Sequence, residues 1–157
     1  TSFWAGDVVT FVQQAAEQGL FEQVDDVLDT IGADPTVFSA LGDTMPEGYH
    51  YSGWYWHSGY DNENNQNFNS AYEDIYGDSN ELPSIPSFTG GSTSSAVFIY
   101  YQAMEAAGST DLDDVIAEME GLSIGDEPRG SISLEADSHK ANDTRVNGVT
   151  SRDDDAP

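Results

Sequence analysis

The chain has 157 residues and carries 29 acidic side chains against four lysines and arginines, for a formal net charge of −25. All four cations follow Pro128, which excludes a nucleic-acid-binding surface, because such a surface needs several cations against phosphates. A P-loop is excluded as well, because its lysine is missing. Cysteine is absent, which excludes disulfides and thiolate metal sites, and no apolar run is long enough to cross a bilayer.

The acidic charge predicts adaptation to concentrated salt rather than disorder. Hydrophobic residues make up 38% of the chain and aromatic residues 11%, which is enough material for a folded core. At about 1 M salt the Debye length is roughly 3 Å, so the repulsion among the carboxylates is largely screened. We therefore expect a folded domain with a carboxylate-covered surface, from a salt-adapted organism.

Apolar spacing, capping residues and terminating glycines predict the elements of the first half. In chain order these are a helix over 7–18, a strand over 24–29, a helix over 35–41, a strand over 49–56, a polar loop over 61–66 and a helix over 68–76. The second helix has the clearest start, because Asp34 can cap it and Pro35 suits its first position.

The second half begins with a segment that contains two prolines and two glycines and is predicted to cross between parts of the molecule. The elements predicted there are this crossing over 82–91, an apolar helix over 93–107, a helix that starts near Asp111, a strand over 129–134 and a frayed polar tail. Helices that alternate with short strands indicate an α/β fold with a mainly parallel sheet. Two helices in succession between 93 and 121 suggest part of a larger protein.

Several stretches, in the right order, resemble type I periplasmic solute-binding proteins, the family that binds branched-chain amino acids, amides and urea for ABC importers. The longest is 100–121, YYQAMEAAGSTDLDDVIAEMEG, which resembles the family pattern A-x-x-x-A-G-S-x-D. Residues 1–20 are similar to the family's site loop and following helix, and 41–51 to its G-x-x-x-E-G approach to a strand. Residues 67–77 and 128–134 resemble a later helix and a strand near the C-terminus. The resemblance covers nearly the whole chain.

The resemblance implies a fold and an activity. The fold would be α/β: an incomplete second, Rossmann-like lobe of a three-layer αβα type. Residues 1–85 would form the ligand-binding segment of that lobe, 86–127 the crossing and helices that belong to the first lobe, and 128–157 the return strand and tail. The function would be extracytoplasmic binding of branched-chain amino acids or related amides in a cleft between the lobes. The alternative is a ligand-sensing regulatory domain of the same fold.

The ligand site of such a sheet lies beyond the carboxyl ends of its strands. Asp29 and Thr30 follow a predicted strand, and the resemblance implies that Asp29 pairs with the ligand's amino group, although Asp25, Asp26 and Asp34 compete for this role. Trp4 lies in the loop before the first helix, where the family often places an aromatic ring against the ligand.

Four aromatic residues cluster at the end of the predicted strand over 49–56. Alternate members should face opposite sides of a sheet, so at most half can touch one ligand, and packing is the default role. Tyr55 is the member predicted to contact the ligand; the others are Tyr51, Trp54 and Trp56.

No catalytic or metal-binding residue is predicted, and no cofactor. His50 and His57 lack a metal-site pattern, and the 61–72 stretch lacks the glycine and the last carboxylate of a calcium loop. Carboxylate pairs are uninformative among so many acids, and neither a G-x-S-x-G motif nor a thiol nucleophile is present. The chain is therefore predicted not to be an enzyme.

The expected partners are a small solute, an amino acid or an amide, and the permease subunits of an ABC importer. The location would be extracellular or on the cell surface, with a membrane anchor in the full-length parent. The apolar helix over 93–107 would normally cover the missing N-terminal lobe. Its exposed side is expected to drive a homodimer of the fragment.

Overall fold

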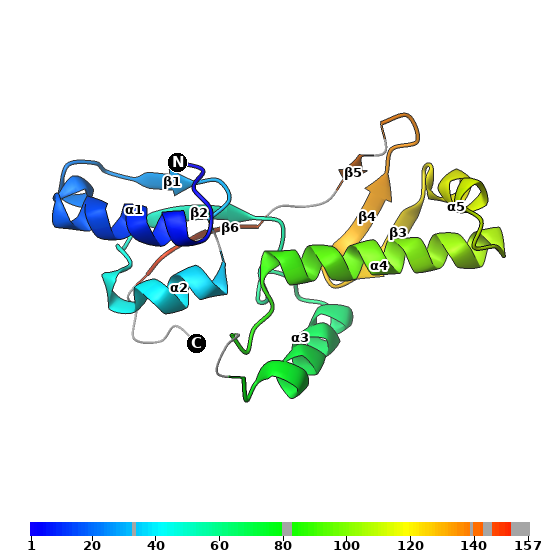
Figure 1. The fold of residues 1–157 in the computed structure, drawn as a ribbon, viewed down its shortest axis with the longest axis horizontal. Coiled ribbons are helices and arrows are strands. Elements are labelled where there is room, and N and C mark those ends of the chain that lie inside the picture. Colours follow the sequence, from blue (N-terminus) through cyan, green and yellow to red (C-terminus); the bar gives the residue numbers. More distant parts are fainter. Residues whose placement is uncertain (33, 80–82, 139, 143–145, 152–157) are drawn as a thin grey trace.

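The structure is a computed structural model that describes residues 1–32, 34–79, 83–138, 140–142 and 146–151. The helices and strands lie in two units (Figure 1). The first unit contains α1 (Gly6–Glu17), β1 (Val27–Asp29), α2 (Pro35–Leu41), β2 (Tyr49–Gly53) and β6 (Val146–Val149). The second contains α4 (Phe88–Ala107), α5 (Leu112–Met119), β3 (Ser123–Glu127), β4 (Gly130–Leu134) and β5 (Ala141–Asn142). Helix α3 (Glu63–Tyr76) lies beside the junction of the two units.

The core of the first unit follows from the apolar spacing of its two helices. Val8 and Val12 lie one turn apart on α1 and are fully buried against Val37 and Leu41 of α2 and Tyr49 of β2. Asp34 caps α2 as predicted, because its side chain accepts a hydrogen bond from the backbone N–H of Thr36.

The first sheet has the order β1-β2-β6, with β1 parallel to β2 and β6 antiparallel to β2. Thr1 pairs with the free edge of β1: its ammonium group donates to Leu28 O at 2.7 Å, and Thr30 N donates to Thr1 O at 3.1 Å. The second sheet, β3-β4-β5, is antiparallel. The α/β class is confirmed, whereas the mainly parallel sheet is wrong, since β1 and β2 form the one parallel pair among the described strands.

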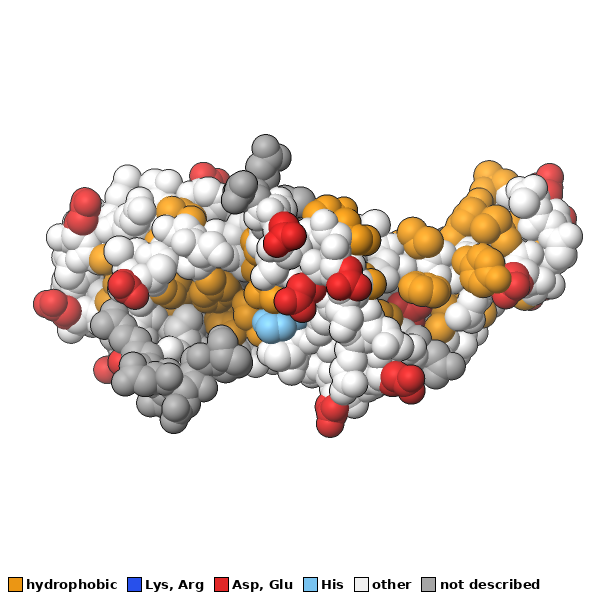
Figure 2. Space-filling view, turned by 90° about the horizontal axis from the view of Figure 1, so that it is seen from below, with side chains coloured by type: hydrophobic (Ala, Val, Ile, Leu, Met, Phe, Trp, Pro, Cys, Tyr) orange, Lys and Arg blue, Asp and Glu red, His pale blue; other side chains and the backbone are white. Residues whose placement is uncertain are grey.

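Helix α4 packs on the second sheet through one side only. Its Ile99 forms a buried cluster with Ile124 of β3 and Ile132 of β4. The opposite side is exposed and apolar, at Val97, Phe98, Tyr100 and Tyr101. Figure 2 shows orange side chains gathered toward the end of the molecule that holds this unit, among scattered red carboxylates.

Two predicted loops are partly helical. Helix α3 starts at Glu63 rather than after the predicted polar loop, because Asn62 caps it by accepting a hydrogen bond from Asn65 N at 2.8 Å. Helix α4 starts at Phe88, so the last residues of the predicted crossing are helical. Ser87 caps α4, and both glycines that indicated a loop, Gly90 and Gly91, lie in its first turns.

The sequence pattern missed three strands and overestimated others. Strands β1 and β2 are shorter than predicted, and β3, β5 and β6 were not predicted at all. Only Ile124 in β3 is a buried apolar residue, and β6 lies in what was predicted to be the frayed tail. Strand β4 pairs with β3, so the boundary proposed at residue 128 falls inside a hairpin, and the chain returns to the first sheet only at β6.

Gly91 is needed where α4 crosses Tyr55. A Cβ at position 91 would lie 2.4 Å from Tyr55 Cγ, whereas a Cβ at position 90 would meet nothing closer than 3.8 Å. We expect Gly91→Ala to lower the free energy of unfolding by about 1–3 kcal/mol through overpacking. Gly90→Ala is the control, and should raise it by up to about 1 kcal/mol through helix propensity. Urea denaturation measures both; equal effects of the two substitutions would contradict the close packing.

Candidate functional site

A cavity of about 270 Å³ lies beyond the carboxyl end of β1, where four segments meet. These are the loop before α1, the turn between β1 and α2, the segment before α4, and one face of α3. Aromatic rings and hydroxyl groups line it together with one carboxylate; the residues that matter most are Trp4, Asp34, Thr36, Tyr72, Phe88 and Thr89. We call it the Trp4 pocket. Its position is where open α/β sheets bind ligands.

Trp4 forms the aromatic wall of this pocket. Its side chain is 47% exposed, and its ring meets the ring of Phe88 edge-on, with centroids 5.1 Å apart. The next residue, Ala5, has φ 47°, a conformation that costs a non-glycine residue about 1–3 kcal/mol. A strained backbone conformation of this kind persists only where the surrounding structure holds the residue in place. The backbone next to Trp4 is therefore held in one conformation.

Asp34 supplies the carboxylate that lines the pocket. One of its oxygens, Oδ1, accepts hydrogen bonds from Thr36 N at 2.9 Å and Thr36 Oγ1 at 2.6 Å, which fixes the side chain at the start of α2. None of the described residues around the pocket is a lysine, arginine or histidine. The pocket therefore favours a cationic or neutral group beside Asp34.

Asp29, the predicted partner of the ligand's amino group, lies inside the protein instead. It is fully buried, accepts hydrogen bonds from Ile31 N and Gly32 N, and accepts a third at 2.9 Å from the Tyr49 hydroxyl. Burial, reinforced by Asp29, raises the pKa of Tyr49 far above its ordinary value. Thr30 is exposed and pairs with Thr1. Neither residue lines the Trp4 pocket.

Tyr55 is also a packing residue in this structure. Its side chain is fully buried, and its hydroxyl lies 2.7 Å from Asn65 Oδ1 and 2.8 Å from Asn69 Oδ1. The ring stacks on Tyr60 with centroids 5.9 Å apart. Burial raises the pKa of Tyr55, and Tyr60 adds to the effect. Of the four predicted site residues, the structure places only Trp4 at the pocket.

Several residues that line the pocket were not predicted from the sequence to be site residues. Asp34 was predicted only as a competitor of Asp29, although its capping position, just past the end of a strand, was a usable signal. Tyr72, Phe88 and Thr89 gave no local signal, because α3 and α4 reach the pocket only through the tertiary fold.

A buried polar cluster joins the two units close to Phe88. Arg129, only 6% exposed, donates from Nε to Ser95 Oγ at 3.1 Å and from Nη1 to Trp54 O at 3.4 Å. Glu127 is 2% exposed, and burial raises its pKa despite Ser95 and Arg129, which act in the opposite direction. Arg129 thus fastens the β3–β4 turn to the segment that follows β2.

The chain matches the sequence profile described as periplasmic binding protein over residues 1–152. It is similar in fold to a leucine-binding protein from Thermotoga maritima, with a TM-score of 0.75, 19% identity, and coverage of 93% of this chain and 39% of that one. An amino acid ABC transporter substrate-binding protein from Pseudomonas fluorescens gives a TM-score of 0.77, 24% identity and coverage of 94% and 37%.

A third structure is a solute-binding protein of an ABC transporter from Rhodopseudomonas palustris, in complex with p-hydroxybenzoic acid. Its TM-score is 0.76, with 18% identity and coverage of 93% of this chain and 38% of that one. A search of curated protein sequences finds no match.

The match over 1–152 shows that the chain belongs to the periplasmic binding protein family. It spans well under half the length of the solved structures named above. In the described ranges no helix is both long and apolar enough to cross a bilayer, and no group of three or more His, Asp or Glu side chains could hold a metal ion.

Proposed function

We propose that the chain is part of the solute-binding component of an ABC importer and binds a small organic solute in the Trp4 pocket. The observation that supports this most is the pocket itself, a ring-lined cavity at the strand end with one fixed carboxylate. Its work would be reversible binding and hinge closure rather than bond making. The proposed location is extracytoplasmic, and the proposed partners are the permease subunits.

The pocket favours a solute with an amino or amide group over an aromatic acid. Asp34 would attract an ammonium group, and the exposed part of the Trp4 ring would add a cation–π contact. A benzoate-type ligand, such as the one named in the Rhodopseudomonas palustris structure, would instead meet a carboxylate with no described cation among the lining residues. An amino acid or a related amide is therefore the proposed solute, and its own carboxylate would find hydroxyl donors but no cation among the described residues that line the pocket.

Substitutions in a full-length parent protein test this proposal. We expect Asp34→Asn to weaken binding of an amino acid by about 30-fold or more, because a buried ammonium loses its partner. Asparagine still caps α2, so the fold is retained. Trp4→Ala should cost about 2- to 30-fold through the lost cation–π contact. Asp25→Asn is the control and should leave binding unchanged, because Asp25 is exposed and does not line the pocket.

Calorimetry against amino acids, amides and hydroxybenzoates measures these affinities. If Asp34→Asn binds amino acids as tightly as the wild type, the amine assignment is wrong. If a hydroxybenzoate binds best and Asp34→Asn improves it, the solute is an aromatic acid. Binding of every solute unaffected by Trp4→Ala would contradict the pocket assignment itself.

We also propose that the exposed side of α4 packs against a further part of the protein, either a missing N-terminal lobe or a second copy of this chain. Val97 is 64% exposed, and no acidic residue interrupts the helix between Phe88 and Met104. We expect the isolated chain to self-associate, and Val97→Glu/Tyr101→Glu to make it monomeric, as measured by light scattering in molar salt. A monodisperse wild-type monomer at high concentration would contradict the second copy as the partner of this surface.

A further inference from the structure

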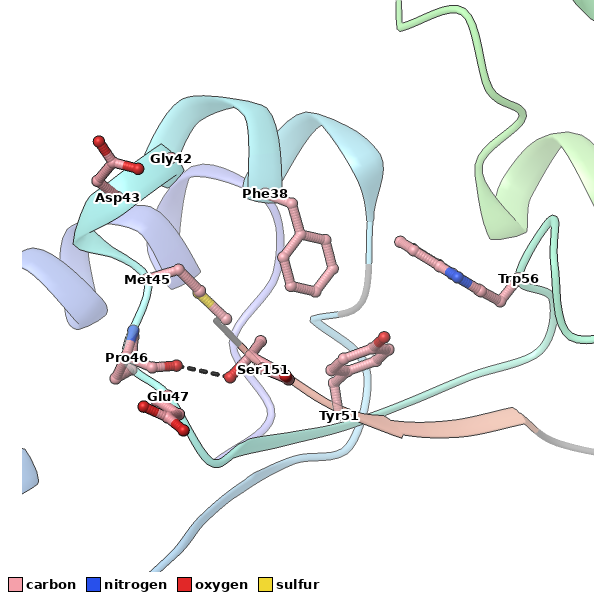
Figure 3. A pocket seen from close by; sticks show the side chains of 10 residues that line it. Phe38, Gly42, Asp43, Met45, Pro46, Glu47, Tyr51, Trp56 and Ser151 are labelled. Carbon is pink, nitrogen blue, oxygen red and sulfur yellow. Dashed lines mark hydrogen bonds between the residues drawn. The ribbon is translucent and has the colours of Figure 1, made fainter. Parts of the chain in front are cut away.

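A second and larger cavity lies on the other side of α2. Its volume is about 590 Å³, within the range of roughly 300–1,000 Å³ typical of small-molecule sites. It runs between α2, the turn that leads into β2, and the end of β6 (Figure 3). None of its lining residues belongs to the Trp4 pocket, so nothing proposed above accounts for it.

Three aromatic rings from three different segments form one end of this cavity. Phe38 comes from α2, Tyr51 from β2 and Trp56 from the loop after β2, and Figure 3 shows the three pointing toward one another. Their centroids are 5.1 to 5.7 Å apart, and their planes meet at 53° to 76°. All three side chains are only partly buried. The three rings therefore pack against one another at an angle, as an aromatic corner at the edge of the cavity, rather than as a flat stack.

Strand β6 leaves room for the Tyr51 ring of this corner. A Cβ on Gly148 of β6 would lie 2.4 Å from Tyr51 Cζ, so the Tyr51 ring lies across β6 only because position 148 has no side chain. Opposite the rings, the cavity continues past Met45 toward Asp43 and Glu47. No described residue that lines the cavity carries a positive charge.

We propose that this cavity is a binding site for a small quaternary ammonium cation that carries no carboxylate. Aromatic faces attract a cation whose charge is spread over methyl groups. Such a cation has no N–H group, so it needs no hydrogen-bond acceptor in the site. The carboxylates of Asp43 and Glu47 add a favourable field for a cation, and would repel the negative end of a zwitterion. The site thus selects choline over glycine betaine, although both carry the same trimethylammonium group.

Choline, glycine betaine and 3,3-dimethyl-1-butanol, the uncharged isostere of choline, separate the contributions of charge and shape. Each is titrated into the ¹⁵N-labelled full chain, and the indole N–H signals of Trp4, Trp54 and Trp56 are followed by NMR. Arg152, which follows Ser151 in the sequence, is replaced by Ser throughout, so that the chain's own guanidinium cannot compete. Trp56 reports on this cavity and Trp4 on the other pocket, so the two proposals fail independently.

We expect choline to shift the Trp56 signal saturably, glycine betaine to bind more weakly, and the neutral isostere to have no effect at the same concentration. Phe38→Leu should weaken choline binding by about 2- to 30-fold, the range expected for loss of one cation–π contact. Glu47→Gln, an exposed change that leaves the rings in place, should narrow the preference for choline over betaine. Trp4→Ala, the matched control, should leave the choline titration unchanged.

Three results would overturn the proposal. The first is an equal response to choline and its isostere, which would mean that the cavity is merely apolar. The second is a choline titration seen at Trp4 and not at Trp56. The third is the absence of any saturable shift at Trp56 while the spectrum remains that of a folded protein.

Discussion

Raising the KCl concentration from about 0.01 M to 1 M is expected to raise the melting temperature of this chain by roughly 10 °C or more. The screening length falls from about 30 Å to about 3 Å over this range, so repulsion across the molecule is lost. With 29 acidic residues and four cations, we expect screening of the repulsion to raise the free energy of unfolding by several kcal/mol. For a chain of this size, 1 kcal/mol corresponds to a shift of roughly 2–4 °C in the melting temperature. On the face seen in Figure 2, red carboxylates are scattered and no blue side chain is visible.

Differential scanning calorimetry at a series of KCl concentrations measures this effect. A variant with fewer charges at the end of α3 and just after it, Glu73→Gln/Asp74→Asn/Asp78→Asn, should show a smaller dependence on salt, because it has less repulsion to screen. A melting temperature that is the same at low and molar KCl would show that the carboxylates are too far apart to matter, and the proposed salt adaptation would be wrong.

Asp29→Ala is expected to lower the free energy of unfolding by about 3–5 kcal/mol. The substitution deprives the Tyr49 hydroxyl and the N–H groups of Ile31 and Gly32 of their acceptor, and each unsatisfied buried donor costs about 1–3 kcal/mol. Urea denaturation measures the loss. Asp26→Ala is the control, because Asp26 is exposed and makes one surface ion pair with His50, worth about 1 kcal/mol at most.

A second substitution tests the physical reason. In the Asp29→Ala background, Tyr49→Phe removes the hydroxyl that has lost its partner, so the double variant should be more stable than the sum of the two single effects predicts. If Asp29→Ala is as stable as Asp26→Ala, the buried hydrogen bonds contribute little, and Asp29 would again become a candidate ligand residue.

The helices were largely predictable from sequence because their signals are local. The capping pair Asp34-Pro35 and the spacing of Val8 and Val12 depend only on neighbouring residues. The strands were harder, because β3 and β6 contain few apolar residues and are stabilised by pairing with β4 and β2. Pairing between segments far apart in the chain produces no pattern that a short stretch of sequence could reveal.

The same distinction explains the site residues. Trp4 could be predicted to lie at the pocket because the loop before the first helix is a position defined by the chain order, and it does line the pocket; its contact with a ligand stays a prediction. The sequence around an aspartate at a strand end is the same whether its side chain faces the ligand or lies buried beneath the next turn. Here the deciding residue is Gly32, where a Cβ would lie 2.1 Å from Asp29 Oδ2, so the carboxylate occupies the space a side chain would need. For Tyr55 the sequence left packing as the default role, and the structure buries its side chain; β2 ends at Gly53, so alternation along the strand could not be extended to position 55.

The hydrogen bonds of Asp29 have a consequence for the solute binding proposed above. They tie the turn after β1 to Tyr49 on the neighbouring strand, and Asp34 in turn is held at the first turn of α2. The described residues of this wall of the Trp4 pocket are therefore held by hydrogen bonds within the chain itself. Under the proposed function, little conformational entropy would be lost at this wall on binding, and encounter with it should be limited mainly by diffusion.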